Sequence, residues 1–457
     1  MHVVCSTILL FCMFAAFCMP FLVVPGTKPG FLHAPLASIC PAGAAGSSDP
    51  TGDEWPMFRG QLNHTGVATT TPVNATGITW SSRIGDGGDS SPAVALGRVY
   101  VGSSDSNVYC FNATTGTLEW NYTTGGYVDS SPAIAGGLVY VGSWDNKTYC
   151  LNATTGTRVW VYTTSSIVQS SPAVEDGRVY VGSWDNKTYC LNATTGVQVW
   201  NYTTHGGVTS SPAVNGGFVY VGSYDDNVYC LNATTGKRVW NYVTIGGVHS
   251  SPAVAGGRIY VGGGYPDKWM YCLNATSGTK IWIYPTNGYI DSSPAVAGGL
   301  VYVGSNDGKV YCLNATTGQQ VWSYSAKNNI GVGVESSPAI ASGFAYVGTG
   351  DGMISCLNAT TGALVWNAFG ASFDSSPAIE GGHVYMVGGA SVYCLPMIYH
   401  APPLPPGINP VIIVMSIICV TAIAIIVGLY ASRYDARRQR NLPSNDAIRK
   451  ADDLRSS

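Results

Sequence analysis

The chain carries little charge and few of the patterns that mark a catalytic site. Only 10% of its 457 residues are Asp, Glu, Lys or Arg, and the formal net charge is −3. This composition argues against nucleic acid as a ligand, because phosphate backbones are bound through clustered Lys and Arg. The seven His are scattered, and the sequence contains no phosphate-binding loop, zinc motif or nucleophile elbow. We therefore expect no catalytic residue and no resident cofactor.

The cysteines lack the spacings of a metal site. No Cys-x-x-Cys motif occurs among the 13 cysteines, and no two are adjacent. Eight of them occupy one position of an internal repeat, at Cys110, Cys150, Cys190, Cys230, Cys272, Cys312, Cys356 and Cys394. Cysteines that lie one repeat apart are beyond the reach of a disulfide, which needs Cα atoms within about 7 Å. We expect these eight to be small buried hydrophobic residues.

What the sequence does contain is one unit of about 40 residues repeated eight times. Its Ser-Ser-Pro signature begins at Ser90, Ser130, Ser170, Ser210, Ser250, Ser292, Ser336 and Ser375. Each unit has four short runs rich in Val, Ile, Tyr and Trp, separated by Gly and Asn turns, and no helical periodicity. This pattern predicts an all-β fold, an eight-bladed β-propeller of four-stranded antiparallel blades.

The pattern also predicts how the ring closes. Complete units end in a strand that carries Trp120, Trp160, Trp200, Trp240, Trp282, Trp322 or Trp366. The eighth unit stops after its third strand, at Tyr393-Cys-Leu, and a matching Ile78-Thr-Trp precedes the first unit. We expect this N-terminal strand to complete the last blade, which would hide both sheet edges. The alternative is seven blades with leftover segments.

These residues resemble a known family. The run Leu-Asn-Ala-Thr-Thr-Gly-x-x-Val-Trp is similar to the tryptophan-docking repeat of the pyrroloquinoline-quinone-like (PQQ-like) β-propellers, as is the opening Trp55-Pro-Met-Phe-Arg-Gly followed by Thr65-Gly. The resemblance covers residues 55–396 and implies that each repeat Trp docks between neighbouring blades. Cys150 and Asn152, with their equivalents, stand where the family usually has Ala and Asp, which leaves the fold intact.

The flanking segments predict a membrane-tethered protein. Residues 1–24 read as a signal peptide or, because a basic start is missing, an uncleaved anchor, and 25–54 as a flexible leader. A Pro-rich linker at 397–410 precedes twenty uncharged residues at 411–430, long enough for one transmembrane helix. The Arg-rich segment 431–457 reads as a cytoplasmic tail. We expect the cell membrane as location, with a single pass and the propeller outside.

Asn-x-Thr sequons support an outside location. They occur at Asn63, Asn74, Asn112, Asn121, Asn146, Asn152, Asn186, Asn192, Asn201, Asn232, Asn274, Asn314 and Asn358. These residues are candidates for glycosylation. In the seven Asn-Ala-Thr copies of the repeats, the alternative is that Asn only hydrogen-bonds its own turn.

Two variable positions of the repeat are candidate binding sites. The residue before each Ser-Ser-Pro should ring one mouth of the central channel, and reads Asp89, Asp129, Gln169, Thr209, His249, Asp291, Glu335 and Asp374. Its five carboxylates could bind a hard cation or a basic group of a partner. The alternative is a solvated rim. The second position, the turn between the second and third strands, carries Trp144, Trp184 and Tyr224, and then an insert that ends at Trp269.

Strand alternation places these aromatic residues on the same face as the mouth, and the Asn-Ala-Thr turns on the opposite face. Exposed aromatic side chains beside polar groups are typical of recognition surfaces for protein or sugar. The alternative is that they only cover neighbouring blades.

Three functions remain open. The first is an extracellular scaffold that binds a protein or a glycan without catalysis. The second, which the resemblance implies, is a quinoprotein dehydrogenase with PQQ and Ca²⁺. Such enzymes carry an adjacent Cys pair and a catalytic Asp, and this chain lacks the Cys pair. The third is a structural envelope or adhesion protein. Fold alone does not decide between them.

Overall fold

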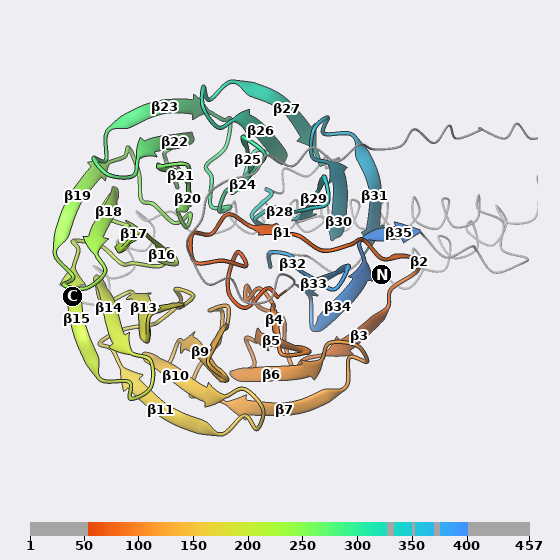
Figure 1. The fold of residues 1–457 in the computed structure, drawn as a ribbon, viewed down its shortest axis with the longest axis horizontal. Coiled ribbons are helices and arrows are strands. Elements are labelled where there is room, and N and C mark those ends of the chain that lie inside the picture. Colours follow the sequence, from red (N-terminus) through yellow and green to blue (C-terminus); the bar gives the residue numbers. More distant parts are fainter. Residues whose placement is uncertain (1–53, 327–332, 350–351, 370–374, 401–457) are drawn as a thin grey trace, which may run out of the picture. The chain divides into compact units, whose positions relative to one another are not determined.

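The computed structural model describes residues 54–326, 333–349, 352–369 and 375–400, where every regular element is a β-strand (Figure 1). Nothing in these ranges is a helix long and apolar enough to cross a membrane. The predicted signal peptide or anchor, the leader up to residue 53, the linker from 401, the transmembrane helix and the tail lie outside the described residues. The prediction of an all-β, eight-bladed propeller with four-stranded antiparallel blades is confirmed.

The second blade shows how each repeat folds. Its strands are β8 (Ala133–Ala135), β9 (Leu138–Ser143), β10 (Lys147–Asn152) and β11 (Arg158–Thr163), paired in that order and all antiparallel. β9, β10 and β11 lie progressively farther from the centre of the ring (Figure 1), and β8 pairs with the inner side of β9. We call the face with the β9–β10 turns and the connections between blades the upper face. The face with the Asn-Ala-Thr turns is the lower face.

Six other blades repeat this order. Their bounds are β4 (Ala93–Ala95), β5 (Arg98–Gly102), β6 (Asn107–Asn112) and β7 (Leu118–Thr123); β12 (Ala173–Glu175), β13 (Arg178–Ser183), β14 (Lys187–Asn192) and β15 (Gln198–Thr203); β16 (Ala213–Asn215), β17 (Phe218–Ser223), β18 (Asn227–Asn232) and β19 (Arg238–Val243); β20 (Ala253–Ala255), β21 (Arg258–Gly262), β22 (Trp269–Asn274) and β23 (Lys280–Pro285); β24 (Ala295–Ala297), β25 (Leu300–Ser305), β26 (Lys309–Asn314) and β27 (Gln320–Ser325); and β28 (Ala339–Ala341), β29 (Phe344–Thr349), β30 (Met353–Asn358) and β31 (Leu364–Phe369).

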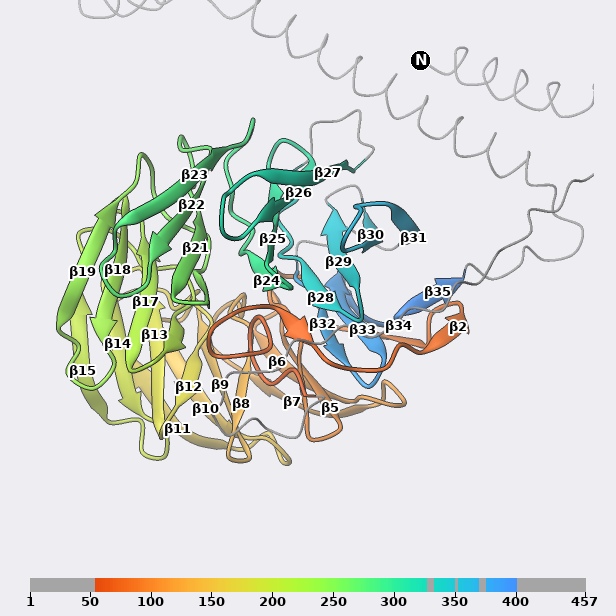
Figure 2. The same ribbon diagram turned by 45° about the horizontal axis from the view of Figure 1, so that its top comes forward.

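The eighth blade is closed by the N-terminal strand, as predicted. It contains β32 (Ala378–Glu380), β33 (His383–Gly388) and β34 (Ser391–Pro396), and β3 (Trp80–Arg83) pairs antiparallel with β34 as the outer strand. A second closure was not predicted. β2 (Asn74–Thr76) pairs parallel with β35 (Ile398–His400) outside this blade (Figure 2). Both ends of the propeller are therefore fixed by backbone pairing.

The core lies between neighbouring blades. One cluster joins Tyr100 and Cys110 of the first blade to Val139 and Tyr149 of the second, all nearly inaccessible to solvent. The same cluster type recurs around the ring, because alternating residues of the two middle strands face the next blade. The eight repeat cysteines are buried free thiols, as predicted. Burial raises the pKa of the Cys150 thiol to about 12, so these thiols stay protonated and unreactive at neutral pH.

The repeat tryptophans dock between blades, as the resemblance implied. The indole nitrogen of each donates a hydrogen bond to a backbone carbonyl of the following blade, as Trp200 does to Ala233 at 3.0 Å. The same bond joins Trp80 to Ala113 and Trp366 to Met397, so it also links the eighth blade to the first and the seventh blade to the eighth. Except at Trp366, the indole also lies against a turn glycine of that blade, Gly236 for Trp200. Each docking contact therefore ties two blades together.

The segment before the first blade occupies the centre of the ring (Figure 1). Backbone hydrogen bonds join this segment to the inner strands of six blades. The bonded pairs are Trp55 with Val94, Pro56 with Ile134, Leu62 with Val214, Asn63 with Val254, Thr65 with Val296 and Gly66 with Ile340. It then continues as β1 (Val67–Ala68), parallel to β28. Further contacts, Glu54 with Leu96 and Thr70 with Ser342, lie at turns of the lower face. We call residues 54–70 the plug.

Candidate functional site

The residues before Ser-Ser-Pro lie where the sequence predicted, at the start of the inner strands on the upper face. Seven of the eight are described, and Asp374 lies outside the described residues. Asp89 and Glu335 are exposed, whereas Asp129, Gln169, Thr209, His249 and Asp291 are half-buried. These positions ring the upper mouth of the channel, above the plug.

Two of the carboxylates act on each other. The pKa of Asp129 is raised to about 6, first by burial and then by the negative charge of Asp89. Hydrogen bonds from Ser104 and Trp144 oppose the rise. The Ser104 hydroxyl lies 3.4 Å from Asp129 Oδ1. A positive group placed at this mouth would relieve the repulsion and favour the charged form of Asp129.

The turn aromatics meet the mouth residues. Trp184 donates a hydrogen bond from Nε1 to Gln169 Oε1 at 3.1 Å, and its ring centroid lies 4.6 Å from that of Tyr224. Tyr224 stacks on His249 at 4.1 Å, and His249 Nδ1 lies 3.3 Å from Asp291 Oδ1. The contacts thus run without a break across four blades.

A second aromatic group lies next to these residues. The Trp144 ring packs 5.4 Å from Tyr127, beside Asp129. We call Asp129, Trp144, Gln169, Trp184, Tyr224, His249 and Asp291 the upper-face row. In the second blade, and again from the third blade to the sixth, residues of the two positions singled out in the sequence contact one another.

Trp269 is not part of this row. It opens the third strand of its blade, β22, where it is half-buried and packs 6.3 Å from the Tyr271 ring. The insert before it instead exposes Tyr265, which lies edge-on to Tyr289 at 6.2 Å. The insert lengthens the turn, so Trp269 falls within the strand rather than at the tip of the turn.

A closed ring of serine hydrogen bonds surrounds the channel below the mouth. The second Ser of each Ser-Ser-Pro accepts a hydrogen bond at Oγ from the backbone N–H of its counterpart in the preceding blade, at 2.8–3.0 Å. The acceptors are, in order, Ser131, Ser171, Ser211, Ser251, Ser293, Ser337, Ser376 and Ser91. The last bond, from Ser376 to Ser91, completes the circle. The sequence showed these serines but not that each bonds to its neighbour.

The plug holds two buried basic residues that sequence reasoning missed. All three guanidinium nitrogens of Arg59 are buried without a hydrogen-bond partner among the described residues, and burial lowers the pKa of Arg59 to about 9. Burial first, and then the charge of Arg59, lower the pKa of His64 to about 3. The signal was the opening motif itself, which carries an Arg among Trp, Met and Phe but belongs to no blade.

The residues of the mouth are mostly carboxylates, aromatic rings and uncharged polar groups. No group of three His, Cys, Asp or Glu that could hold a metal occurs in the described parts of the chain. PQQ carries three carboxylates, and the ring offers carboxylates of its own without any Lys or Arg. Its one basic residue, His249, is paired with Asp291. The eight described cysteines are buried within the blades, so none faces the mouth as a quinone-contacting thiol.

Comparisons with known proteins agree on the fold. The family described as outer membrane protein assembly factor BamB matches residues 71–206, 164–250 and 244–397. No curated protein matches the chain.

Three solved structures illustrate the likeness. BamB from Moraxella catarrhalis is 19% identical, with a TM-score of 0.61 over 70% of this chain and 99% of that one. A europium-containing methanol dehydrogenase is 16% identical, with a TM-score of 0.64 over 74% and 90%. The quinohemoprotein alcohol dehydrogenase of Comamonas testosteroni is 17% identical, with a TM-score of 0.66 over 77% and 81%. At these identities the likeness shows the fold alone.

Proposed function

The chain belongs to the family of the outer membrane protein assembly factor BamB, and we propose that it is a membrane-tethered, extracellular propeller that holds a partner protein as a non-catalytic scaffold. The tether would be the apolar segment 411–430, with the basic tail after it in the cytoplasm. The partner would bind on the upper face, at the upper-face row.

The observation that carries this proposal is the row itself. Trp144, Trp184 and Tyr224 are 38%, 36% and 37% exposed although each contacts a polar neighbour. Large aromatic side chains that stay exposed and are held in place by their neighbours are typical anchors of protein interfaces. Nothing in the fold requires an aromatic residue at these turns, because the equivalent turn of the sixth blade carries Asn306.

The charge of the mouth indicates what the partner presents. Asp89, Asp129, Asp291 and Glu335 place negative charge beside the aromatic rings, and the raised pKa of Asp129 marks repulsion that a cation would relieve. A partner segment with Lys or Arg would meet both features, since cations bind carboxylates and aromatic faces alike. A glycan would use only the aromatic part of the row.

The test is cross-linking of the full chain in the membranes that contain it, followed by identification of the cross-linked peptides. With Trp144 and Trp184 both replaced by Ala, we expect upper-face cross-links to the partner to disappear while thermal unfolding stays cooperative. Val159 and Val199, exposed on the outer strands, give a matched control when both are replaced by Ala. Cross-links that persist in the Trp double variant would instead favour a structural envelope or adhesion protein.

A quinoprotein dehydrogenase is the second candidate, because two of the solved structures similar in fold are dehydrogenases. The mouth residues do not fit PQQ, which ranks this candidate lower. The purified chain would be mixed with PQQ, Ca²⁺ and a panel of alcohols or sugars, and dye reduction followed. Sustained turnover that is abolished by Asp129→Ala would reverse the ranking.

A further inference from the structure

The folded chain sorts its sequons into two groups. In ten of the thirteen, the Thr that a glycosyltransferase must recognise is exposed. These belong to Asn74, Asn112, Asn121, Asn152, Asn192, Asn201, Asn232, Asn274, Asn314 and Asn358. In the other three, at Asn63, Asn146 and Asn186, it is the buried Thr65, Thr148 or Thr188. Asn63 lies in the plug, and Asn146 and Asn186 lie in upper-face turns.

The exposed group occupies two surfaces. Seven of its asparagines lie at the Asn-Ala-Thr turns around the lower rim, Asn121 and Asn201 lie on the outermost strands β7 and β15, and Asn74 lies in β2. The upper-face row therefore has only buried-Thr sequons beside it. Asn146 and Asn186 follow Trp144 and Trp184 by two residues, so a glycan there would stand next to the aromatic rings.

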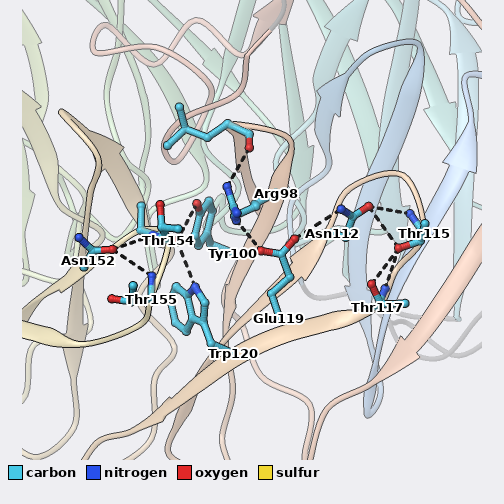
Figure 3. A network of polar contacts seen from close by, with 12 residues as sticks. Arg98, Tyr100, Asn112, Thr115, Thr117, Glu119, Trp120, Asn152, Thr154 and Thr155 are labelled. Carbon is cyan, nitrogen blue, oxygen red and sulfur yellow. Dashed lines mark hydrogen bonds and ion pairs between the residues drawn. The ribbon is translucent and has the colours of Figure 1, made fainter.

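The lower-rim turns hold each Asn with its nitrogen available. Asn152 Oδ1 accepts hydrogen bonds from the backbone N–H of Thr154 and Thr155, at 3.0 and 2.9 Å (Figure 3). The turn therefore uses the oxygen and not Nδ2, the atom that carries an N-linked glycan. The interpretation that Asn bonds its own turn is thus correct and compatible with modification.

The first blade shows where that nitrogen points. Asn112 Nδ2 donates to Glu119 Oε1 at 3.4 Å, on the outer wall of the propeller (Figure 3). In the other complete blades the position of Glu119 is an apolar residue, between 41% and 49% exposed. These residues are Val159, Val199, Val239, Ile281, Val321 and Val365. By the equivalence of the blades, the nitrogens of the rim asparagines face a stripe of exposed apolar residues.

This stripe lies on outer strands, which are sheet edges. Exposed apolar edges invite pairing with other chains unless something covers them. We propose that the ten exposed-Thr sequons are N-glycosylated on the folded chain and that Asn63, Asn146 and Asn186 are not. Carbohydrate then covers the lower rim and the outer wall, and the upper face stays clear for a partner. The inference rests on the extracellular location in the proposed function.

The chemistry needs no group from this chain other than the amide. Asn Nδ2 attacks the anomeric carbon of a lipid-linked oligosaccharide, the new C–N bond forms, the C–O bond to the lipid phosphate breaks, and one amide proton is released. Nothing is oxidised or reduced. The transferase must also contact the Thr hydroxyl of the sequon, and Thr148 and Thr188 have no solvent-exposed surface within β10 and β14.

The test is site-resolved glycopeptide mass spectrometry of the full chain, isolated from the cells that naturally make it. We expect glycan on the exposed-Thr sequons and occupancy at least about tenfold lower at Asn146 and Asn186. In a paired control, Thr154→Val removes the glycan at Asn152 and Thr154→Ser keeps it. Both leave the backbone N–H of residue 154 to bond Asn152 Oδ1.

Two results would overturn the inference. Glycan absent from every lower-rim sequon would show that these turns are purely structural. Equal occupancy at Asn146 and Asn152 would show that modification does not follow the folded surface. Neither result decides the scaffold proposal, because cross-linking of the Trp144 and Trp184 variant reads the upper face with or without carbohydrate.

Discussion

The indole nitrogen of Trp80 donates a hydrogen bond to the carbonyl of Ala113 at 2.9 Å and so ties the eighth blade, which the Trp80 strand completes, to the first blade. Trp200 makes the same bond to Ala233 within the repeats, at 3.0 Å. The N-terminal strand thus supplies the docking contact that the incomplete eighth unit lacks. The eighth blade is therefore joined to the first by the same tryptophan hydrogen bond that joins the other neighbouring blades.

Removing a docking tryptophan should weaken the whole ring. We expect Trp200→Ala to lower the free energy of unfolding by about 3–5 kcal/mol, because a large buried aromatic side chain and its hydrogen bond are both lost. Val199→Ala, at the neighbouring exposed position, should change it by less than about 0.5 kcal/mol. Urea unfolding followed by tryptophan fluorescence and circular dichroism compares the two. Equal midpoints for both variants would contradict the docking role.

The turn glycines test the same contact from the other side. Gly236 and Gly216 both have positive φ, +70° and +59°, but a Cβ at Gly236 would lie 2.6 Å from the Trp200 ring, whereas one at Gly216 would meet nothing within 4 Å. We expect Gly216→Ala to cost about 1–2 kcal/mol from backbone strain alone. Gly236→Ala should cost clearly more, because the indole must move. If both variants lose the same stability in thermal unfolding, backbone strain and not contact with the indole would be the reason for glycine at position 236.

The fold was predictable because its determinants are local and repeated. The strands and the turns each have a signal within about 40 residues, and eight copies remove ambiguity. The Trp80 closure was predictable because the eighth unit lacks the fourth strand that the other units have. The same periodicity placed Trp184, Tyr224 and His249 on one face, but it did not predict the contacts between their rings.

The serine ring, the binding of the plug and the position of Trp269 were not predicted, because each depends on contacts that no local sequence pattern indicates. Ser91 Oγ accepts a hydrogen bond from the backbone N–H of Ser376, which is 285 residues away in the chain. In the sequence, the second Ser of each Ser-Ser-Pro cannot be told from an ordinary turn residue. The plug bonds to backbone groups of the inner strands, which every residue type supplies. Trp269 lies outside the upper-face row because the insert before it lengthens the turn, so that Trp269 is the first residue of strand β22.

Stability should depend on pH through Asp129. Its pKa is about 6 in the folded chain and about 4 in an unfolded one, so the folded chain binds more proton between these values. The stabilisation is therefore full below about pH 4 and is lost as pH rises through 6. We expect Asp129→Asn to raise the free energy of unfolding at pH 8 by about 1–2 kcal/mol, allowing for solvent screening, and to leave it nearly unchanged at pH 4.

Urea unfolding at pH 4, 6 and 8 measures this difference. Asp86→Asn, at an exposed bend between β3 and β4, serves as the control and should show no such pH dependence. A loss of stability at pH 8 in Asp129→Asn would mean that the charged carboxylate is favoured in the fold. The repulsion from Asp89 would then be outweighed by another contact.

The plug offers the sharpest test of whether a buried charge supports this fold. Arg59 is buried without a hydrogen-bond partner in the described chain, its pKa is lowered to about 9, and its Nη2 would lie 2.2 Å from a Cβ placed on Gly66. Removing an unpaired guanidinium from water is costly, and an apolar side chain of similar length at the same place avoids that cost. We therefore expect Arg59→Met to keep or raise the melting temperature. Arg59→Lys keeps the buried charge, so we expect it not to raise the melting temperature. A melting temperature that falls with Met and is restored by Lys would show that the positive charge itself stabilises the plug.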